Sequence, residues 1–188
     1  IPPALEYLTQ LECLIISDNN IQGSIPPELM FLKNLAALSL SANRISGTLP
    51  IALTNVTKLE FLDISQNLLS GTLKPLSVGR HSQLTRILLN NNSISGEIPP
   101  DLGYFPSLEI MDLSYNNLSG RVPLFLQNVP YVDLSFNNLN GPIPGGLREF
   151  QLRGNKGVCS KESYYQTEFQ IQPCPVHDNK IIMAGGNK

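Results

Sequence analysis

The chain has 188 residues and a net charge of −2, with 15% charged and 41% hydrophobic residues. A weakly acidic chain without a basic stretch lacks the electrostatic footprint of a protein that binds nucleic acid or anionic lipid. No apolar run of about 18–20 residues occurs, so the sequence predicts no membrane span.

One phrase recurs along most of the chain. It reads Asn-x-(Leu/Ile)-x-Gly-x-(Ile/Leu/Val)-Pro, or a close variant, and follows Leu-x-x-Leu-x-Leu. Successive copies of its asparagine are 24, 24, 25, 24 and 21 residues apart, at Asn19, Asn43, Asn67, Asn92, Asn116 and Asn137. A period in the twenties with this pattern is the signature of a leucine-rich-repeat solenoid.

Each repeat is predicted to contain a strand, a tight turn, a short second strand and an irregular or briefly helical return segment. Alternate strand side chains point into one core, in the pairs Leu14 and Ile16, Leu38 and Leu40, Leu62 and Ile64, Ile87 and Leu89, Met111 and Leu113, and Val132 and Leu134. Because one coil cannot bury its apolar side chains alone, the coils stack. The predicted fold class is an α/β repeat solenoid, a right-handed superhelix with a parallel concave β-sheet, short second strands and short helical or 3-10 return segments.

The recurring asparagine lies where the strand ends and the backbone bends. Its amide can donate to and accept from peptide groups that the turn removes from sheet pairing. We therefore predict a ladder of asparagine side chains through the stacked coils. The glycine gives the following bend its backbone freedom, and the proline ends the second strand because it has no amide hydrogen. The third repeat departs from this pattern, since Lys74 and Pro75 replace the usual proline, and we expect a bulge on the convex side there.

Phrases such as "LEFLDISQNLLSGTL", "LEIMDLSYNNLSGRVP" and "VDLSFNNLNGPIP" resemble the extracellular repeats of plant leucine-rich-repeat receptor-like kinases. The resemblance covers about Leu5 to Cys174. The final "LRGNKGVCS" with Cys174 resembles the C-terminal cap of such ectodomains, which implies a Cys159–Cys174 disulfide and an oxidising, extracellular compartment. Closing this loop is worth about 3 kcal/mol. Cys13 is left over, and we expect it to be a partly shielded thiol.

The resemblance also frames the domain organisation. We expect leucine-rich repeats over residues 1–153 (about six coils), a C-terminal disulfide cap over 154–175 and a flexible tail over 176–188. The chain opens within a repeat, without the cysteine-paired N-terminal cap of the family, a signal peptide or a kinase motif. It is therefore expected to be a fragment or truncated product of a larger ectodomain.

Three glycosylation triplets fit an extracellular location. They begin at Asn55, Asn91 and Asn117, and Asn55 is expected to be the most accessible of them. Such triplets also arise by chance in a repeat that is rich in asparagine and serine.

The sequence predicts no catalytic site, metal site or cofactor. The two histidines, His81 and His177, have no cysteine or acid at ligand spacing. Asp63, Asp112 and Asp133 form an outward column that Leu88 interrupts, and we interpret these carboxylates as hydrogen-bonding groups on the exposed sheet face rather than as a catalytic pair.

The outward strand residues are the candidate binding site, because a solenoid uses its concave sheet for recognition. Exposed aromatic residues with an arginine are typical of contact hot spots. The candidate ligand-binding residues are Phe61, Asp63, Arg86, Leu88, Ile110, Asp112, Tyr115, Tyr131 and Phe136. Alternatively, neighbours in one column simply pack on each other across adjacent strands.

Three functions follow from these observations. The first is an extracellular recognition module that binds a peptide or protein ligand, and in the receptor-like kinases that the chain resembles the C-terminal coils also meet a co-receptor. The second is a secreted inhibitor of a cell-wall hydrolase, similar to the polygalacturonase-inhibiting proteins. The third is a scaffold without a ligand.

Overall fold

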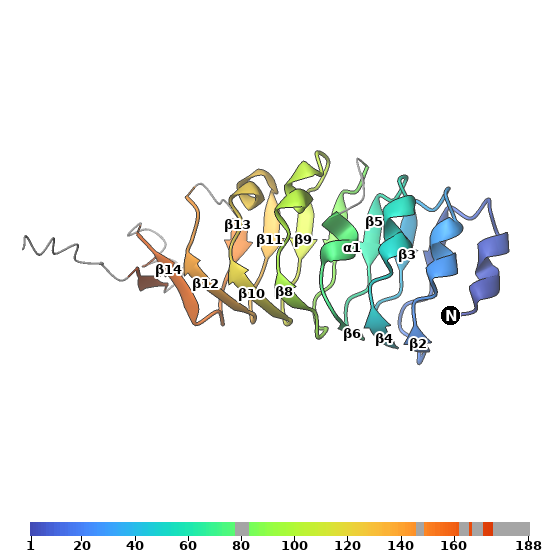
Figure 1. Ribbon diagram of the computed structural model, residues 1–188, viewed down its shortest axis with the longest axis horizontal. Coiled ribbons are helices and arrows are strands. Elements are labelled where there is room, and N and C mark those ends of the chain that lie inside the picture. Colours follow the sequence, from blue (N-terminus) through green and yellow to red (C-terminus); the bar gives the residue numbers. More distant parts are fainter. Residues whose placement is uncertain (78–82, 146–148, 162–165, 167–170, 175–188) are drawn as a thin grey trace, which may run out of the picture.

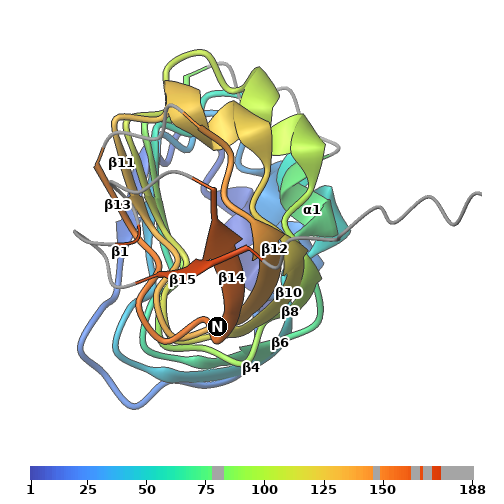
Figure 2. The same ribbon diagram turned by 90° about the vertical axis from the view of Figure 1, so that its left-hand side faces the viewer.

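The computed structural model describes residues 1–77, 83–145, 149–161, 166 and 171–174. Its coils stack side by side along one long axis, and each coil repeats the same course of the chain (Figure 1). In the view along that axis, one sheet lies on one side of the coils, while the second strands and the short helices form the other sides (Figure 2). The chain is an α/β repeat solenoid, which confirms the predicted fold class.

The largest sheet contains one strand from each coil. It has the order β1-β3-β5-β7-β9-β11-β13, and every pair of neighbours is parallel. The strands are β1 (Cys13–Ile15), β3 (Ala37–Ser39), β5 (Phe61–Asp63), β7 (Arg86–Leu88), β9 (Ile110–Asp112), β11 (Tyr131–Asp133) and β13 (Glu149–Gln151). The register is continuous, so equivalent residues of successive coils stand in straight rows. The middle residue of each strand points inward and the two flanking residues point outward.

The second strands form two further parallel sheets. The first has the order β2-β4-β6, and the second has the order β15-β14-β12-β10-β8. Their strands are β2 (Gln22–Ser24), β4 (Arg44–Thr48), β6 (Leu68–Ser70), β8 (Ser95–Glu97), β10 (Asn117–Arg121), β12 (Asn138–Pro142), β14 (Gly157–Ser160) and β15 (Gln172–Pro173). Strands β6 and β8 belong to different sheets, although Ser93 N donates to the Leu69 carbonyl and Ser95 N to the Gly71 carbonyl between their coils. The glycine of each phrase has a positive φ, for example 83° at Gly47, which explains why that position is not occupied by a larger residue.

Short helices form the return segments. Five are 3-10 helices: η1 (Pro3–Tyr7), η2 (Pro27–Phe31), η3 (Ile51–Asn55), η4 (Pro100–Tyr104) and η5 (Leu124–Asn128). A proline in extended conformation precedes each of them, as Pro50 precedes η3, and its fixed φ of −68° directs the chain into the helix. The third coil instead contains α1 (Lys74–Ser77), which packs against η3 and η4. The helix begins at Lys74 and Pro75, where the sequence predicted a bulge, and residues 78–82 that follow it lie outside the described residues.

The core runs the length of the solenoid as one continuous cluster. The inward leucines of successive strands, such as Leu38 and Leu62, are completely buried and stack on one another. Beside them lies the asparagine ladder. The Asn67 side chain accepts from the Ile45 amide at 2.9 Å and donates to the Leu40 carbonyl at 3.0 Å, both in the preceding coil, and to the Ile64 carbonyl in its own coil. Asn43, Asn92, Asn116 and Asn137 join two coils in the same way, whereas the side chain of Asn19 in the first coil bonds only to carbonyls of its own coil.

The repeat continues beyond the six phrases of the sequence analysis. Strand β13 adds a seventh coil, in which Phe150 and Leu152 are buried at the two inward positions, and Phe150 stands in register with Val132 of β11. Asn155 makes the next step of the ladder, because its Oδ1 accepts from the Leu139 amide at 3.0 Å and its Nδ2 donates to the Leu134 carbonyl at 2.8 Å. The ladder thus extends two residues past the boundary at residue 153 that the sequence suggested.

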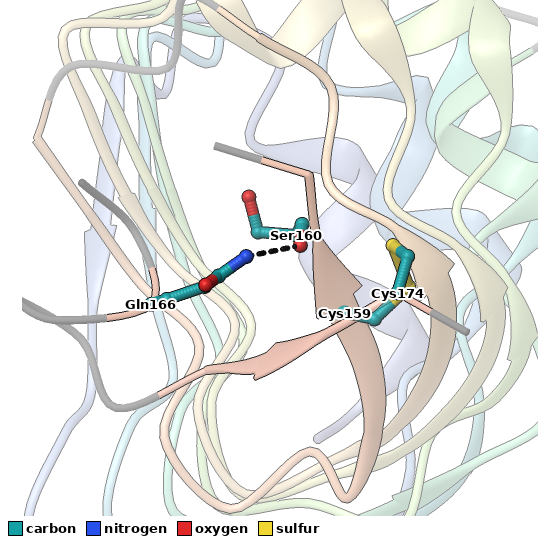
Figure 3. Close-up of a disulfide and its surroundings, with 4 residues drawn as sticks. All are labelled: Cys159, Ser160, Gln166 and Cys174. Atoms are coloured by element: carbon teal, nitrogen blue, oxygen red, sulfur yellow. Dashed lines mark hydrogen bonds between the residues drawn. A yellow bond between two sulfur atoms is a disulfide. The ribbon is translucent and has the colours of Figure 1, made fainter. Parts of the chain in front are cut away.

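A disulfide joins the last two strands of the second sheet. Cys159 on β14 is bonded to Cys174, which follows β15, with 4.7 Å between the two Cα atoms. The Ser160 carbonyl beside this bond accepts hydrogen bonds from the Gln166 side chain at 2.9 Å and from the Cys174 amide (Figure 3). Cys13 is a free, exposed thiol, so the expectation of partial shielding was wrong: β1 lies at the edge of its sheet, and no preceding strand covers it.

Candidate binding face

The outward side chains of the seven-stranded sheet form what we term the outer face. Two straight rows run across it, set by the sheet register. One contains Cys13, Ala37, Phe61, Arg86, Ile110 and Tyr131, and the other contains Ile15, Ser39, Asp63, Leu88, Asp112 and Asp133. Because strands of a sheet lie about 4.8 Å apart, each row presents one side chain at every such step. An extended ligand lying across the strands would meet every coil in turn.

A third row projects from the turn at the end of each strand. Its residues are Asp18, Ala42, Gln66, Asn91, Tyr115 and Phe136, and all have φ between 52° and 56°. This left-handed conformation is costly for residues other than glycine. The backbone nevertheless holds it, since the turn amides donate to the next coil: Tyr115 N donates to the Ser135 carbonyl and Phe136 N to the Arg153 carbonyl. The fold therefore fixes the direction of these side chains whatever their chemistry.

Aromatic rings of this third row form a stack near the C-terminal end of the sheet. The rings of Tyr115 and Phe136 lie 4.3 Å apart between centroids at 17°. The guanidinium group of Arg153 lies over the other side of Phe136, with its carbon 5.9 Å from the ring centroid. Tyr115 is 50% exposed and Phe136 is 38% exposed, so the stack is ordered without being covered. We refer to Tyr115, Phe136 and Arg153 as the aromatic stack.

The three aspartates of the second row are partly engaged by their own strands. Asp63 and Asp112 each accept hydrogen bonds from the backbone amide and hydroxyl of the serine two residues later, and Asp133 accepts from the Ser135 amide. Burial raises the pKa of the Asp112 carboxyl; hydrogen bonds from Ser114 oppose this effect, and the nearby charges of Asp133 and Asp63 add to it. An ionised Asp112 is thus less stable here than in water, and a cation brought to this row would relieve that penalty.

The structure places the predicted residues on one face but gives them unequal exposure. Arg86, Tyr115, Tyr131 and Phe136 are exposed, whereas Phe61, Asp63, Leu88, Ile110 and Asp112 are half-buried between neighbours in their rows. Sequence reasoning missed Arg153, because its repeat lacks the full phrase. It also undervalued Ile15, which is 66% exposed on the edge strand.

The glycosylation triplets lie on different sides of the solenoid. Asn55 ends η3, Asn91 stands in the third row beside the outer face, and Asn117 begins β10, and all three are exposed. The histidines named from the sequence, His81 and His177, lie outside the described residues, as does the tail over 176–188. Across the part of the chain that the structure describes, no group of three or more His, Cys, Asp or Glu side chains is placed to hold a metal ion, and no helix is long and apolar enough to cross a membrane.

Comparisons with known proteins agree with this architecture. A family model described as leucine rich repeat matches residues 4–69, and a second of the same description matches residues 83–105, 107–129 and 130–150. No curated protein sequence matches the chain.

Similar solved structures come from plant proteins. A plant ice-binding protein is 33% identical (TM-score 0.73), with 85% of this chain aligned to 53% of that one. The Arabidopsis receptor kinase HAESA, in complex with the peptide hormone IDA and the co-receptor SERK1, is 33% identical (TM-score 0.66), with 85% of this chain aligned to 32% of that one. The BIR2 ectodomain from Arabidopsis thaliana is 31% identical (TM-score 0.62), with 78% aligned to 68%.

The chain belongs to the leucine-rich-repeat family. Within it, the similar structures include the ectodomain of the plant receptor kinase HAESA, which confirms the family suggested by the sequence phrases. The chain spans about half of the ice-binding protein and about a third of the HAESA structure.

Proposed function

We propose that this chain is an extracellular recognition module whose outer face binds a peptide or protein ligand. The observation that carries the proposal is the aromatic stack beside the exposed Tyr131, on a sheet whose register lines up every outward side chain. Tyrosine, phenylalanine and arginine in a fixed geometry are typical contact hot spots, because little conformational entropy is lost when a ligand covers them.

The mode of binding follows from the rows. An extended peptide lies across β5, β7, β9 and β11, with apolar side chains against Phe61, Ile110 and Tyr131. The second row places Asp112 and Asp133 beside the aromatic stack, which favours a ligand with a basic group at that point. Leu88 separates this acidic part from Asp63, so the ligand alternates between polar and apolar contacts. A similar structure, HAESA, is a receptor kinase in complex with a peptide hormone, which supports a peptide as the ligand class.

A selection experiment tests this proposal without a known ligand. A random peptide library displayed on phage is panned against the wild-type chain, and the enriched peptides are then measured against a variant with Arg86, Tyr115 and Tyr131 replaced by alanine. We expect affinity to fall at least tenfold, because hot-spot truncations typically cost more than about 1.4 kcal/mol.

The control has three substitutions on the second strands, Arg44→Ala, Leu68→Ala and Ser70→Ala, at exposed positions away from the outer face. Peptides that bind both variants as tightly as the wild type would remove the outer face as the binding site. Normal thermal melts for both variants show that any loss is local.

A second candidate function rests on the sheet β2-β4-β6. Ser24, Thr48 and Thr72 each lie against the glycine of the following coil, within 3.3 Å of the point where its Cβ would stand, and so present one hydroxyl residue per coil in a regular column. Hydroxyl groups repeated at the strand spacing of about 4.8 Å can order a surface layer of water. We propose ice binding by this column as the alternative, since a similar structure is a plant ice-binding protein.

Ice recrystallisation separates the two candidates. The alternative predicts that the wild-type chain arrests crystal growth and that Thr48→Tyr, which puts a large ring into the hydroxyl column, abolishes this effect. The variant with Arg86, Tyr115 and Tyr131 replaced should retain it. Crystals that grow as they do in buffer would dismiss ice binding and leave peptide recognition untouched.

A further inference from the structure

A pocket lies away from the outer face, beside the C-terminal disulfide. It has a volume of about 920 Å³ and lies over β10, β12, β14 and β15. The Cys159–Cys174 disulfide and the two strands that it joins form part of its lining (Figure 3). A volume of this size can hold a ligand of several residues, since ordinary ligand pockets range from about 300 to 1,000 Å³.

Three basic side chains line this pocket: Arg121 at the end of β10, Lys156 just before β14 and Lys161 just after it. Among the described lining residues none is acidic. Within the described part of the chain, no hydrogen bond or ion pair engages these three side chains. A hollow lined by one sign of charge concentrates the field and attracts ligands of the opposite sign. The overall charge of the chain is −2, so the positive charge of this pocket is a local excess.

Glycines of β12 and β14 allow side chains of the neighbouring strands to lie close to the backbone beside the basic groups. Arg121 stands in register with Asn140, and Asn140 with Gly157. Gly157 has no room for a Cβ, which would lie 2.8 Å from the Cβ of Asn140. Gly141 next to Asn140 is covered by the Arg121 side chain, whose Cγ lies 3.3 Å from the point where a Cβ would stand. The Arg121 side chain therefore passes over Gly141 of β12 and is still exposed to solvent.

The register also gives the spacing of the charges. Arg121 and Gly157 are two strands apart, or about 10 Å at the usual strand separation. Lys156 and Lys161 are five residues apart along an extended strand, or about 16 Å at about 3.3 Å per residue. An extended segment of about five residues has the same length, and its alternate side chains project to the same side. The pocket thus matches an extended chain with several carboxylates.

We propose that this pocket binds an acidic peptide segment in extended conformation, with its carboxylates paired to Arg121, Lys156 and Lys161. Clusters of arginine and lysine are a recurring means of recognising acidic motifs. The exposed Gln172 side chain in the lining has an amide that can donate to and accept from peptide groups, which favours a peptide as the occupant. This site is separate from the outer face and does not depend on the function proposed for it.

Binding of fluorescein-labelled hexaglutamate, followed by fluorescence anisotropy at low salt, tests the proposal. We expect saturable binding to the wild-type chain that weakens as salt is added, because exposed ion pairs are screened. Replacing Arg121, Lys156 and Lys161 together by glutamine should weaken binding about tenfold, given about 0.5 kcal/mol for each of three exposed ion pairs.

The matched control replaces Lys33, Arg44 and Lys58 by glutamine, which changes the net charge by the same amount at exposed positions outside the pocket. It should bind hexaglutamate within about twofold of the wild type, since remote charges are screened beyond about 10 Å. Neutral hexaglutamine should not bind.

Three results would overturn the proposal. One is the absence of hexaglutamate binding at about 1 mM, the weak limit of a specific contact. Another is an equal loss of hexaglutamate affinity in the pocket variant and in the matched control, which would mean that binding depends only on the net charge of the chain. The third is binding of hexagalacturonate without binding of hexaglutamate, which would make the occupant a glycan.

Discussion

The two halves of the outer face share one backbone and differ in what they present to solvent. In β1 and β3 the outward residues include Cys13, Ala37 and Ser39, and the turn that follows β3 carries Ala42. In β9 and β11 they are Ile110, Asp112, Tyr131 and Asp133, and the turns carry Tyr115 and Phe136. The inward positions are apolar throughout, and the ladder asparagine recurs in every coil. The interior thus specifies a coil that can be repeated, while the exterior is free to change from coil to coil.

Core truncation should have the largest effect, and a similar one in both halves. Leu38 and Met111 are completely buried at the same inward position of β3 and β9. Leu38→Ala and Met111→Ala are each expected to lower the free energy of unfolding by about 2–5 kcal/mol, because each leaves a cavity between stacked coils.

Urea unfolding provides the measurement, and Arg86→Ala provides the comparison. Arg86 is exposed on the outer face, and its removal should change stability by no more than about 0.5 kcal/mol. A large loss at Arg86, or a loss in only one of the two core variants, would show that interior and exterior are not separate in the way described.

The asparagine ladder should give the next largest effect. Asn67→Ala removes an acceptor for the Ile45 amide and a donor to the Leu40 carbonyl, and leaves both peptide groups buried. We expect a loss of about 1–3 kcal/mol in thermal or urea unfolding. Asn19 is the matched control, since it is exposed and its side-chain hydrogen bonds stay within its own coil. Equal losses for Asn19→Ala and Asn67→Ala would contradict a role in joining coils.

The core and ladder residues of these two predictions belong to the pattern of inward-pointing side chains, which the sequence alone reveals. Leucines and asparagines recur in phase, so the strands and the parallel sheet follow from periodicity alone. The seventh coil was missed because Phe150 replaces leucine and no Gly-x-Ile-Pro follows Asn155. The left-handed turn was missed because alanine, tyrosine and phenylalanine have no preference for it; hydrogen bonds from the next coil impose it.

The candidate site was only partly predictable for a related reason. Alternation along a strand says which side chains point outward, but exposure depends on the neighbouring coils. Phe61 is half-buried between Ala37 and Arg86, whereas Tyr115 remains half exposed even in its stack. The basic pocket could not be inferred at all, because Arg121 and Lys161 are 40 residues apart and meet only through the pairing of β10, β12 and β14.

Glycine substitutions in the third row sharpen the comparison between halves at a smaller scale. Ala42→Gly relieves the strain of a positive φ without removing a side-chain contact. We expect it to raise the free energy of unfolding by about 0.5–1 kcal/mol. This is the energy gained by relieving the strain, minus the cost of the larger conformational entropy that glycine gives the unfolded chain. Phe136→Gly relieves the same strain but loses the stacked ring, worth about 0.5–1.5 kcal/mol, and should be neutral or destabilising.

The measured quantity is the difference between the two glycine variants in urea unfolding. Stabilisation by Phe136→Gly as large as that by Ala42→Gly would mean that the aromatic stack contributes nothing to folding. The ring would then be present for its outward surface alone.

The smallest effect should come from Asp112, which belongs to the C-terminal half only. Burial raises the pKa of its carboxyl in the folded state above the value in the unfolded chain. Between these two values the folded state binds more protons than the unfolded state, so stability falls as the pH rises through this window and stays lower above it.

Asp112→Asn retains an oxygen that can accept from Ser114 but carries no charge. It should therefore be more stable than the wild type at pH 7, and the difference should disappear at a pH below the ordinary range of aspartate. Asp101→Asn, at an exposed position on η4, is the isosteric control for the loss of one carboxylate from the chain. If Asp112→Asn were less stable than the wild type at pH 7, the ionised carboxylate would be held by its hydrogen bonds from Ser114 more strongly than burial disfavours it, and the outer face would have no penalty for a cationic ligand to relieve.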